Sequence, residues 1–168
     1  MIRKKTPKVK IPKQLSNQIT KLLDTAKVKY KVLEHKVVYT AHDVSATTKK
    51  KLGEIAKVVL VKVDKSFVLI VLPAGKYIDF KGIKKALKAK KVSMASEKDI
   101  EKYLKTKVGL LHPFGSVYNI QTLIDKGISK NKKLIASAGS FSHSVELALK
   151  DFEKLIKPIK GSFSKAKK

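Results

Sequence analysis

The chain has 168 residues, and 43% of them are apolar, which suits one domain with a packed core. Its 39 Lys and Arg against 13 Asp and Glu give a net charge of +26, so we expect a polyanionic partner, above all a nucleic acid. The lack of cysteine excludes disulfides, thiol nucleophiles and cysteine-ligated zinc. No run reaches the roughly 20 apolar residues of a membrane span, and no apolar segment follows the first residues, so we expect a cytoplasmic protein without a membrane partner.

The positive charge is spread over the whole chain. Residues 1–13 carry six basic residues and residues 161–168 carry three, in both cases without an acid. The other 30 basic and 13 acidic residues still give +17, so the charge also belongs to the folded part. We therefore expect a basic arm over 1–13, a domain over 14–160 and a basic tail over 161–168, the two ends adding sequence-independent affinity for RNA. A general lysine enrichment of the source is an alternative explanation, and an anionic membrane surface is a weaker one because no helix combines a wide apolar face with a basic one.

Hydrophobic spacing predicts helices and strands mixed along the chain. The first half is expected to hold a helix from Leu15 to Ala26, a strand over 30–35, a helix over 41–51, and two buried strands, 56–63 and 66–73, that form a central hairpin. The second half is expected to hold a helix over 80–89 capped by Asp79, a strand over 91–94, a helix from a capping box at Ser96 to Leu104, a loop over 108–117, strands over 118–124, 134–137 and 143–147, and a last helix ending before Pro158. Because strands and helices do not alternate regularly, we predict a single α+β domain with a mixed, mainly antiparallel sheet, or a barrel-like sheet, flanked by helices.

Lys57 stands out because it interrupts an apolar strand face. The period of two places Lys57 on the same face as Val59, Val61 and Val63, which we expect to be the core face. A lysine there either extends its ammonium group to solvent or presents it to an anionic ligand.

Two further segments have the small, rigid residues of ligand-contacting loops. Gly109 to Gly115 contains two glycines and a proline, and residues 137–141 are mostly small. Each is also compatible with an ordinary turn. The four histidines lack zinc-ligand spacing, and no nucleophile elbow, Walker loop or dinucleotide fingerprint is present, so composition and spacing alone stop at a basic α+β domain that binds an anionic ligand.

Six short motifs, in order, resemble those of the YbaK-type aminoacyl-tRNA deacylases, the family that includes the editing insertion of bacterial prolyl-tRNA synthetases. The resemblance runs from about Tyr30 to Pro158. The motifs are Glu34-His35 with Tyr39-Thr40-Ala41, Ala56-Lys57-Val58-Val59, Val71-Leu72-Pro73-Ala74 with Ile78-Asp79, the G-x-x-x-P loop from Gly109 to Pro113 with Phe114-Gly115, Ser137-Ala138-Gly139, and Asp151-Phe152-Glu153-Lys154-Leu155 with Pro158.

The resemblance implies a trans-editing hydrolase that removes a small, wrongly attached amino acid from tRNA. It implies catalytic roles for Lys57, near the tRNA 3′ end, and for the loop bounded by Gly109 and Pro113, which would hold the aminoacyl group through its backbone. A hydroxyl of the terminal ribose would help to activate water, so no metal or other cofactor is expected. The residues implied to contact the substrate are His35, Thr40, Leu110, Leu111, His112, Ser137, Ala138, Gly139 and Phe141. The expected partner is the acceptor end of aminoacyl-tRNA, an aminoacyl-tRNA synthetase is a second candidate partner, and we expect a monomer.

The sequence departs from the family pattern at four positions. Val58 follows the lysine where Thr is frequent, Ser137 replaces Asn, Phe141 stands where relatives often carry His, and His112 is not typical of the loop. Phe141 would either stack on the terminal adenine or fill core. These departures motivate an alternative function, a non-catalytic basic tRNA-binding module with the same fold. A free-standing small-molecule esterase is least favoured because no activated nucleophile is visible.

Overall fold

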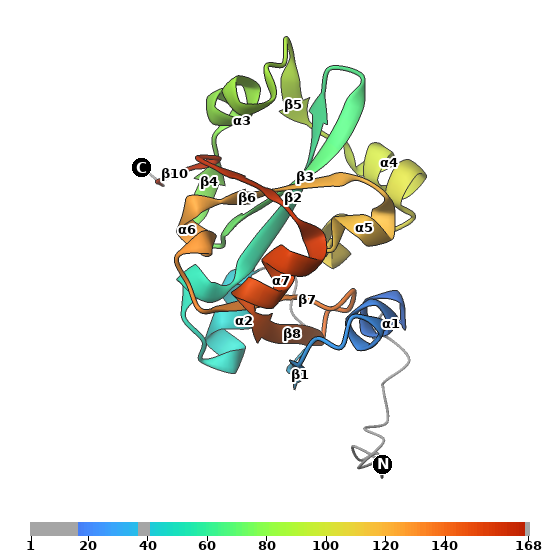
Figure 1. Ribbon diagram of the computed structural model, residues 1–168, viewed down its shortest axis with the longest axis vertical. Helices are drawn as coiled ribbons and strands as arrows, with labels where there is room; N and C mark the ends of the chain where they lie inside the picture. The colour runs from blue at the N-terminus through green and yellow to red at the C-terminus, as the bar shows by residue number, and fades with distance from the viewer. Residues whose placement is uncertain (1–16, 37–40, 167–168) are drawn as a thin grey trace.

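The computed structural model describes residues 17–36 and 41–166 (Figure 1). Its strands are β1 (Tyr30–Glu34), β2 (Ala56–Val63), β3 (Ser66–Pro73), β4 (Lys76–Ile78), β5 (Val92–Met94), β6 (Gln121–Asp125), β7 (Lys133–Ser137), β8 (His143–Ala148), β9 (Ile159–Gly161) and β10 (Ser164–Ala166). Its helices are α1 (Asn17–Thr25), α2 (Ala41–Thr48), α3 (Phe80–Leu87), α4 (Glu97–Asp99), α5 (Gly115–Tyr118), α6 (Lys126–Ser129) and α7 (Leu149–Ile156), with short turns η1 (Leu52–Glu54), η2 (Ile100–Leu104) and η3 (Val108–Leu110). Among these residues, no helix combines the length and apolar character needed to cross a membrane.

The strands form three sheets. The largest has the order β5-β2-β3-β6-β9; β2 pairs antiparallel with β3 and β5, and β6 lies parallel to both β3 and β9. The second, β1-β8-β7, is antiparallel throughout, and the third pairs β4 with β10. The predicted α+β domain with a mixed, mainly antiparallel sheet is therefore confirmed, and the sheet stays open instead of closing into a barrel.

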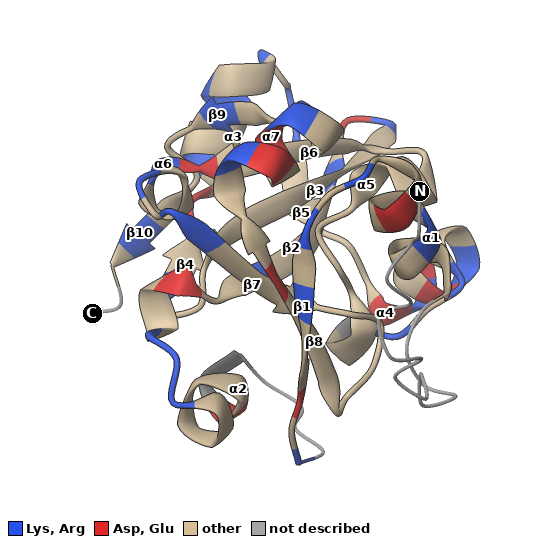
Figure 2. Cartoon of the chain, turned by 60° about the horizontal axis from the view of Figure 1, so that its bottom comes forward, with Lys and Arg blue, Asp and Glu red and all other residues tan. Residues whose placement is uncertain are grey.

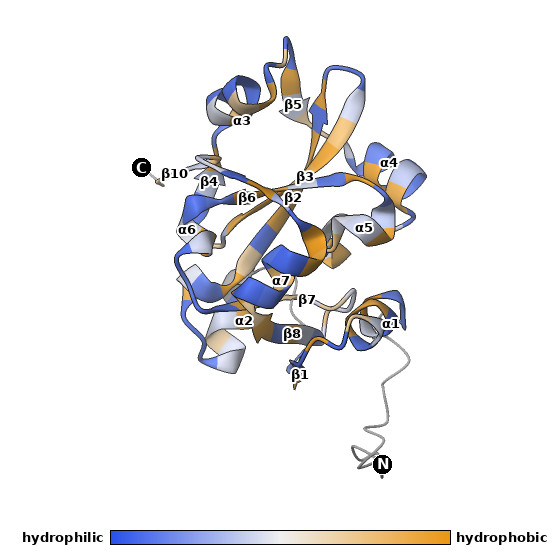
Figure 3. Cartoon of the chain, in the orientation of Figure 1, coloured by the Kyte–Doolittle hydropathy of each residue, from blue (hydrophilic) through white to orange (hydrophobic). Residues whose placement is uncertain are grey.

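The central hairpin is buried on both faces, as its continuous apolar runs predict. One face packs against Ile83 of α3 and against Phe163, while the other packs against η2 and Leu111. A further cluster joins the β1-β8-β7 sheet to α1 and α7, where Phe114 and Phe152 meet edge to face. The hydropathy colouring shows the apolar residues gathered on these inner strands and the hydrophilic side of α7 turned outward (Figure 3).

Local signals fix several element ends. The Asp79 side chain accepts a hydrogen bond from the Lys81 N–H at the start of α3, and Ser96 and Asp99 form the complete capping box that opens α4. The strand predicted over 118–124 begins only at Gln121, because residues 115–118 form α5 and Asn119 ends it in a left-handed conformation (φ 59°). The ordered fold also continues past residue 160 through β10, into the segment that the sequence analysis treats as a tail.

Asp125 holds this C-terminal segment in place. Its buried carboxylate accepts hydrogen bonds from the Gly127 N–H (2.8 Å), the Phe163 N–H (2.7 Å) and the Ser164 hydroxyl (2.8 Å). The ring of Phe163 is fully buried against the central sheet, so the carboxylate joins a backbone turn to a core side chain.

We expect Asp125→Ala to lower the free energy of unfolding by about 3 kcal/mol or more, because buried donors that lose their acceptor each cost about 1–3 kcal/mol. Urea unfolding would measure the change. Ser164→Ala, which removes one donor and leaves the carboxylate with the other two, should cost only about 1 kcal/mol. Equal losses in the two variants would contradict this role of Asp125.

Candidate functional site

The face of the β1-β8-β7 sheet opposite the Phe114–Phe152 cluster brings two predicted substrate-binding residues together. Ser137 on β7 pairs with Ser144 on β8, and the His35 Nε2 lies 3.0 Å from the Ser144 Oγ. The His35 Nδ1 lies 2.8 Å from the carbonyl oxygen of Lys36, which can only accept, so in the neutral ring Nδ1 carries the proton and Nε2 accepts the Ser144 hydroxyl proton. His35 and Ser137 therefore lie on either side of Ser144.

The first residues of β2 lie against this sheet. Ile55 forms a parallel bridge with Ile135 of β7, and β2 and β7 remain in contact beyond it. Lys57 and Ser137 each stand two residues beyond the bridge and point to the same side as the bridged residues. The sheet contact thus brings the predicted catalytic lysine to the strand end that carries Ser137.

Lys57 occupies a polar gap between two apolar clusters on one face of β2. Ile55 belongs to a small cluster on one side of it, and Val59, Val61 and Val63 belong to the central core on the other, so the predicted core face is confirmed. The Lys57 side chain is half-buried, and its Nζ lies 5.9 Å from the ring centroid of Tyr77, a residue that is 49% exposed. The ammonium group is therefore held beside an exposed aromatic ring at the rim of the core.

The turn after β7 is fixed by its own hydrogen bonds. The Ser137 Oγ accepts from the Gly139 N–H (3.2 Å), and the Ala138 N–H donates to the His143 carbonyl (3.2 Å). Gly139 has φ 76°, a conformation that favours glycine. The side chain of Ala138 is fully buried, so at this position the turn presents only its backbone to the site.

The loop from Gly109 to Pro113 exposes only its first residues. Gly109 is exposed and Leu110 half-buried, whereas Leu111, His112 and Pro113 are buried. Leu111 packs against Leu60 and Leu69 on the central sheet. The buried residues 111–113 therefore fix the loop to the core, and the accessible part of the loop is Gly109 with Leu110.

Gly109 joins this loop to the turn after β7. A Cβ atom at residue 109 would lie 2.6 Å from the Cε1 of Phe141, closer than side chains can approach. A larger residue here would force the Phe141 ring or the loop to move, because the ring lies directly against the backbone of the loop. Two segments that the sequence analysis proposed separately are thus in contact.

His112 is a buried support of the loop. It stacks on Tyr118 with ring centroids 4.3 Å apart, and its Nδ1 accepts the Phe114 N–H (3.3 Å). Burial lowers the pKa of His112 to about 3, so the ring is neutral near pH 7 with its proton on Nε2. Burial also raises the pKa of Tyr118 to about 12. The Tyr118 hydroxyl accepts a hydrogen bond from the backbone N–H of His112, which offsets this rise only in part. His112 therefore holds the loop in shape.

Because the folded-state pKa of His112 lies below the unfolded value of 6.5, the unfolded chain binds the extra proton between pH 6.5 and about 3. The stability contributed by the neutral ring is present above pH 6.5 and is lost as the pH falls toward 3. We expect the free energy of unfolding of His112→Phe to depend less on pH in this window, by at most about 1.4 kcal/mol per pH unit. Urea titrations at several pH values would measure it, and parallel pH profiles for the two proteins would contradict it.

Sequence reasoning missed a buried carboxylate on the face of the site. Glu146 lies two residues beyond Ser144 on β8, 3.1 Å from the Lys50 Nζ and 3.6 Å from the Lys133 Nζ. Burial raises its pKa, but the hydrogen bonds and charges of the two lysines outweigh burial and hold the pKa of Glu146 below its usual value. The alternation of β8, with Val145 and Leu147 in the core, was the signal that could have found it.

Two further polar features near the site also escaped the sequence analysis. The buried His143 Nδ1 lies 3.0 Å from the Ser140 Oγ and 2.9 Å from the Ser142 Oγ, underneath the turn after β7. Tyr77 lies beside Lys57 only because β4 returns next to the hairpin, which no local pattern signals. The predicted contact residue Thr40 lies outside the described residues. Within 17–36 and 41–166, no group of three or more His, Asp or Glu could hold a metal ion.

Basic residues are spread over many elements of the described chain. Figure 2 shows Lys and Arg distributed over many helices and strands, with fewer acidic segments between them. A surface of this kind attracts a polyanion from many directions and leaves orientation to the site itself.

The sequence pattern of the aminoacyl-tRNA editing domain family matches residues 35–155. This stretch includes the loop at Gly109, the turn after β7 and Lys57. The chain belongs to this family. Its substrate class is therefore aminoacyl-tRNA, and the resemblance found from the motifs is confirmed.

One named relative is similar in sequence, and two solved structures are similar in fold. The prolyl-tRNA editing protein ProX of Acetoanaerobium sticklandii is 27% identical over 147 residues, which cover 84% of this chain and 90% of the relative. The crystal structure of hypothetical protein APE2540 has a TM-score of 0.81 at 17% identity and covers 88% of this chain and 99% of its own. A structure named as a candidate trans-editing enzyme for prolyl tRNA synthetase has a TM-score of 0.77 at 14% identity, covering 89% and 96%.

Proposed function

We propose that this editing domain protein acts in trans as a deacylase, hydrolysing the ester between a small amino acid and the terminal ribose of a non-cognate tRNA. Support comes chiefly from one arrangement: Lys57 and Ser137 lie at the contact of β2 with β7, and Gly109 lies against Phe141 of the adjoining turn. The name of one relative refers to prolyl-tRNA and that of a second to prolyl tRNA synthetase, so the tRNA for proline is the carrier we propose.

The reaction needs positioning more than an activated side chain. A water molecule attacks the ester carbonyl carbon, and the bond from that carbon to the ribose oxygen breaks. One proton of the water passes to the ribose oxygen, and the amino acid leaves as a carboxylate after the other proton is released to solvent. We propose that the neighbouring ribose hydroxyl helps to orient the water. Backbone N–H groups of the loop at Gly109 would stabilise the negative charge on the carbonyl oxygen.

Lys57 would hold the tRNA end. Its ammonium group is half-buried beside Tyr77, where a phosphate could approach from solvent and the charge would be screened less than on an open surface. We propose that it binds the terminal phosphodiester and so fixes the ester against the loop. The aromatic ring of Tyr77 offers the adenine a stacking surface next to that phosphate.

The size of the amino acid would be limited by Phe141 and Leu110. Both are half-buried, and the Phe141 ring lies directly on the loop backbone at Gly109. This leaves an apolar wall close to the groups that would hold the carbonyl, which favours alanine, cysteine or serine over larger side chains. The protein would work in the cytoplasm, where charged tRNA is made, and an aminoacyl-tRNA synthetase is a second candidate partner.

The deciding experiment is a panel of charged tRNAs. Ala-, Cys- and Ser-charged tRNA for proline would be incubated with the full chain, with correctly charged Pro-tRNA as the matched control. We expect hydrolysis of at least one mischarged species and little hydrolysis of the control. Salt-sensitive binding of all four without any turnover would instead support the non-catalytic tRNA-binding module.

A further inference from the structure

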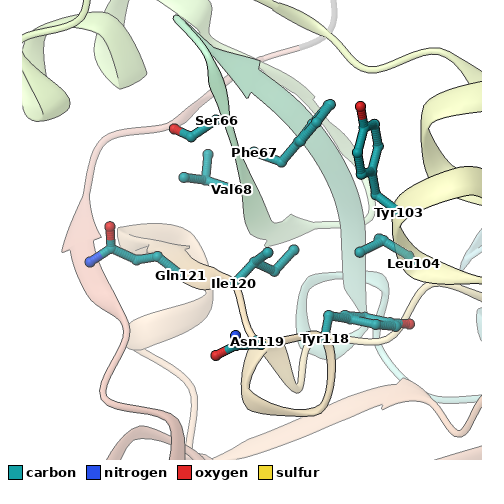
Figure 4. Close-up of a pocket in the computed structure, with 9 residues that line it drawn as sticks. All are labelled: Ser66, Phe67, Val68, Tyr103, Leu104, Tyr118, Asn119, Ile120 and Gln121. Atoms are coloured by element: carbon teal, nitrogen blue, oxygen red, sulfur yellow. The ribbon is translucent and has the colours of Figure 1, made fainter.

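A cavity lies away from the editing site. It has a volume of about 480 Å³ and is lined by Phe67 of β3, Tyr103 and Leu104 of η2, and Tyr118, Asn119 and Gln121 at the α5–β6 turn (Figure 4). Phe67 pairs with Lys62, five residues along β2 from Lys57, which corresponds to about 16 Å of strand. Phe67 packs with the cluster on the opposite face of the hairpin from Lys57. The two sites are therefore separate.

The cavity presents aromatic rings that are already fixed in position. Phe67 and Tyr103 lie with ring centroids 4.9 Å apart at 40°, and the Lys102 Nζ lies 5.1 Å from the Tyr103 centroid. Tyr103 is 53% exposed, and Tyr118 faces the cavity from its other end (Figure 4). A ring held by neighbours loses little conformational entropy when a flat ligand stacks on it.

The charged residues near the cavity indicate which class of ligand it binds. Asn119 and Gln121 are exposed and lie on the side of the cavity away from Phe67 and Tyr103, and the Gln121 amide points away from the rings (Figure 4). Four lysines adjoin lining residues in sequence or strand register, namely Lys62, Lys65, Lys102 and Lys105. Three acids adjoin these lysines: Asp64 and Glu101 in sequence, and Asp99, whose pKa the charges of Lys62 and Lys102 help to lower. Flat rings with a small excess of positive charge beside them suit a nucleobase with its phosphate.

The cavity also touches the support of the editing loop. Tyr118 stacks on the His112 ring, and the Tyr118 hydroxyl accepts a hydrogen bond from the backbone N–H of His112 (3.4 Å). A ligand that packs on Tyr118 therefore contacts a residue that supports the Gly109–Pro113 loop through His112.

We propose that this cavity binds one unpaired nucleotide of the tRNA whose charged end occupies the editing site. The identity of the RNA rests on the proposed function. The 16 Å of strand between the sites means that this nucleotide is a different one from the terminal adenosine. Its base stacks beside Tyr103, and its phosphate lies near the lysines.

The test measures the affinity of uncharged tRNA for the full chain at fixed salt. We expect Tyr103→Ala to weaken binding by about 5- to 100-fold, the range for losing one stacked base, and Tyr103→Phe to bind as the wild type does. Met94→Ala is the matched control, because Met94 is 54% exposed and does not line the cavity. It should leave the affinity unchanged. In deacylation assays Tyr103→Ala should raise KM and spare kcat.

The proposal fails if Tyr103→Ala binds tRNA as tightly as the wild type. The ligand of the cavity would then be of another class, such as a peptide or a lipid. It also fails if Tyr103→Phe loses as much affinity as Tyr103→Ala, because stacking would then not be the cause. Both readings are independent of turnover. A protein that binds uncharged tRNA through Tyr103 but hydrolyses no ester refutes the proposed function and leaves this site standing.

Discussion

Lys57→Met is expected to reduce kcat/KM for deacylation of mischarged tRNA by about 100-fold or more, the scale for removing one positioned charge from a reacting ester. Lys57 lies on the face of β2 between Ile55 and Val59, which belong to two apolar clusters, and methionine keeps an aliphatic chain there while it removes the ammonium group. The stability of the variant should stay within about 1 kcal/mol of the wild type. Single-turnover deacylation and urea unfolding would measure the two effects.

The matched control is Lys84→Met on α3. Lys84 is exposed, lies outside both the editing site and the cavity, and its removal lowers the net charge by the same single unit. It should leave single-turnover deacylation at saturating enzyme unchanged. If both variants lose the same activity, the effect of Lys57 is general attraction of RNA and its assignment to the site is wrong.

The sequence predicts the parts of this fold that short-range chemistry determines. The hairpin of β2 and β3 follows from two β-branched runs separated by Asp64-Lys65, and its ends fall where predicted. The Asp79 and Ser96 caps follow from side chains that bond their own helix starts. In each case the deciding contacts lie within a few residues of each other.

Contacts between distant segments had no such signal. The meeting of Gly109 with Phe141, and of Tyr77 with Lys57, depends on how the loops return across the sheet. The short strand β10 is held by Asp125, nearly forty residues away, and not by its own composition. The family resemblance supplied the residues of the candidate site, whereas their arrangement required the structure.

Gly109→Ala is expected to lower kcat for deacylation by about 10- to 100-fold with little change in stability. The new Cβ would lie 2.6 Å from the Phe141 ring, so either the ring or the exposed edge of the loop must move, and displacements near 1 Å at a reacting centre cost about this much. The buried half of the loop, anchored by Leu111 and His112, should keep the fold intact. Single-turnover rates and thermal unfolding would measure both.

A double-mutant cycle isolates the contact. Phe141→Ala removes the atoms that the new methyl group would strike, so Gly109→Ala should cost markedly less activity in the Phe141→Ala background than in the wild type. Strictly additive losses would mean that residue 109 acts on the substrate without Phe141. A non-additive result would establish that the loop and the turn after β7 form one surface. Neither segment carries an activated nucleophile of its own. The site must therefore work by positioning, and positioning requires the two segments to act together.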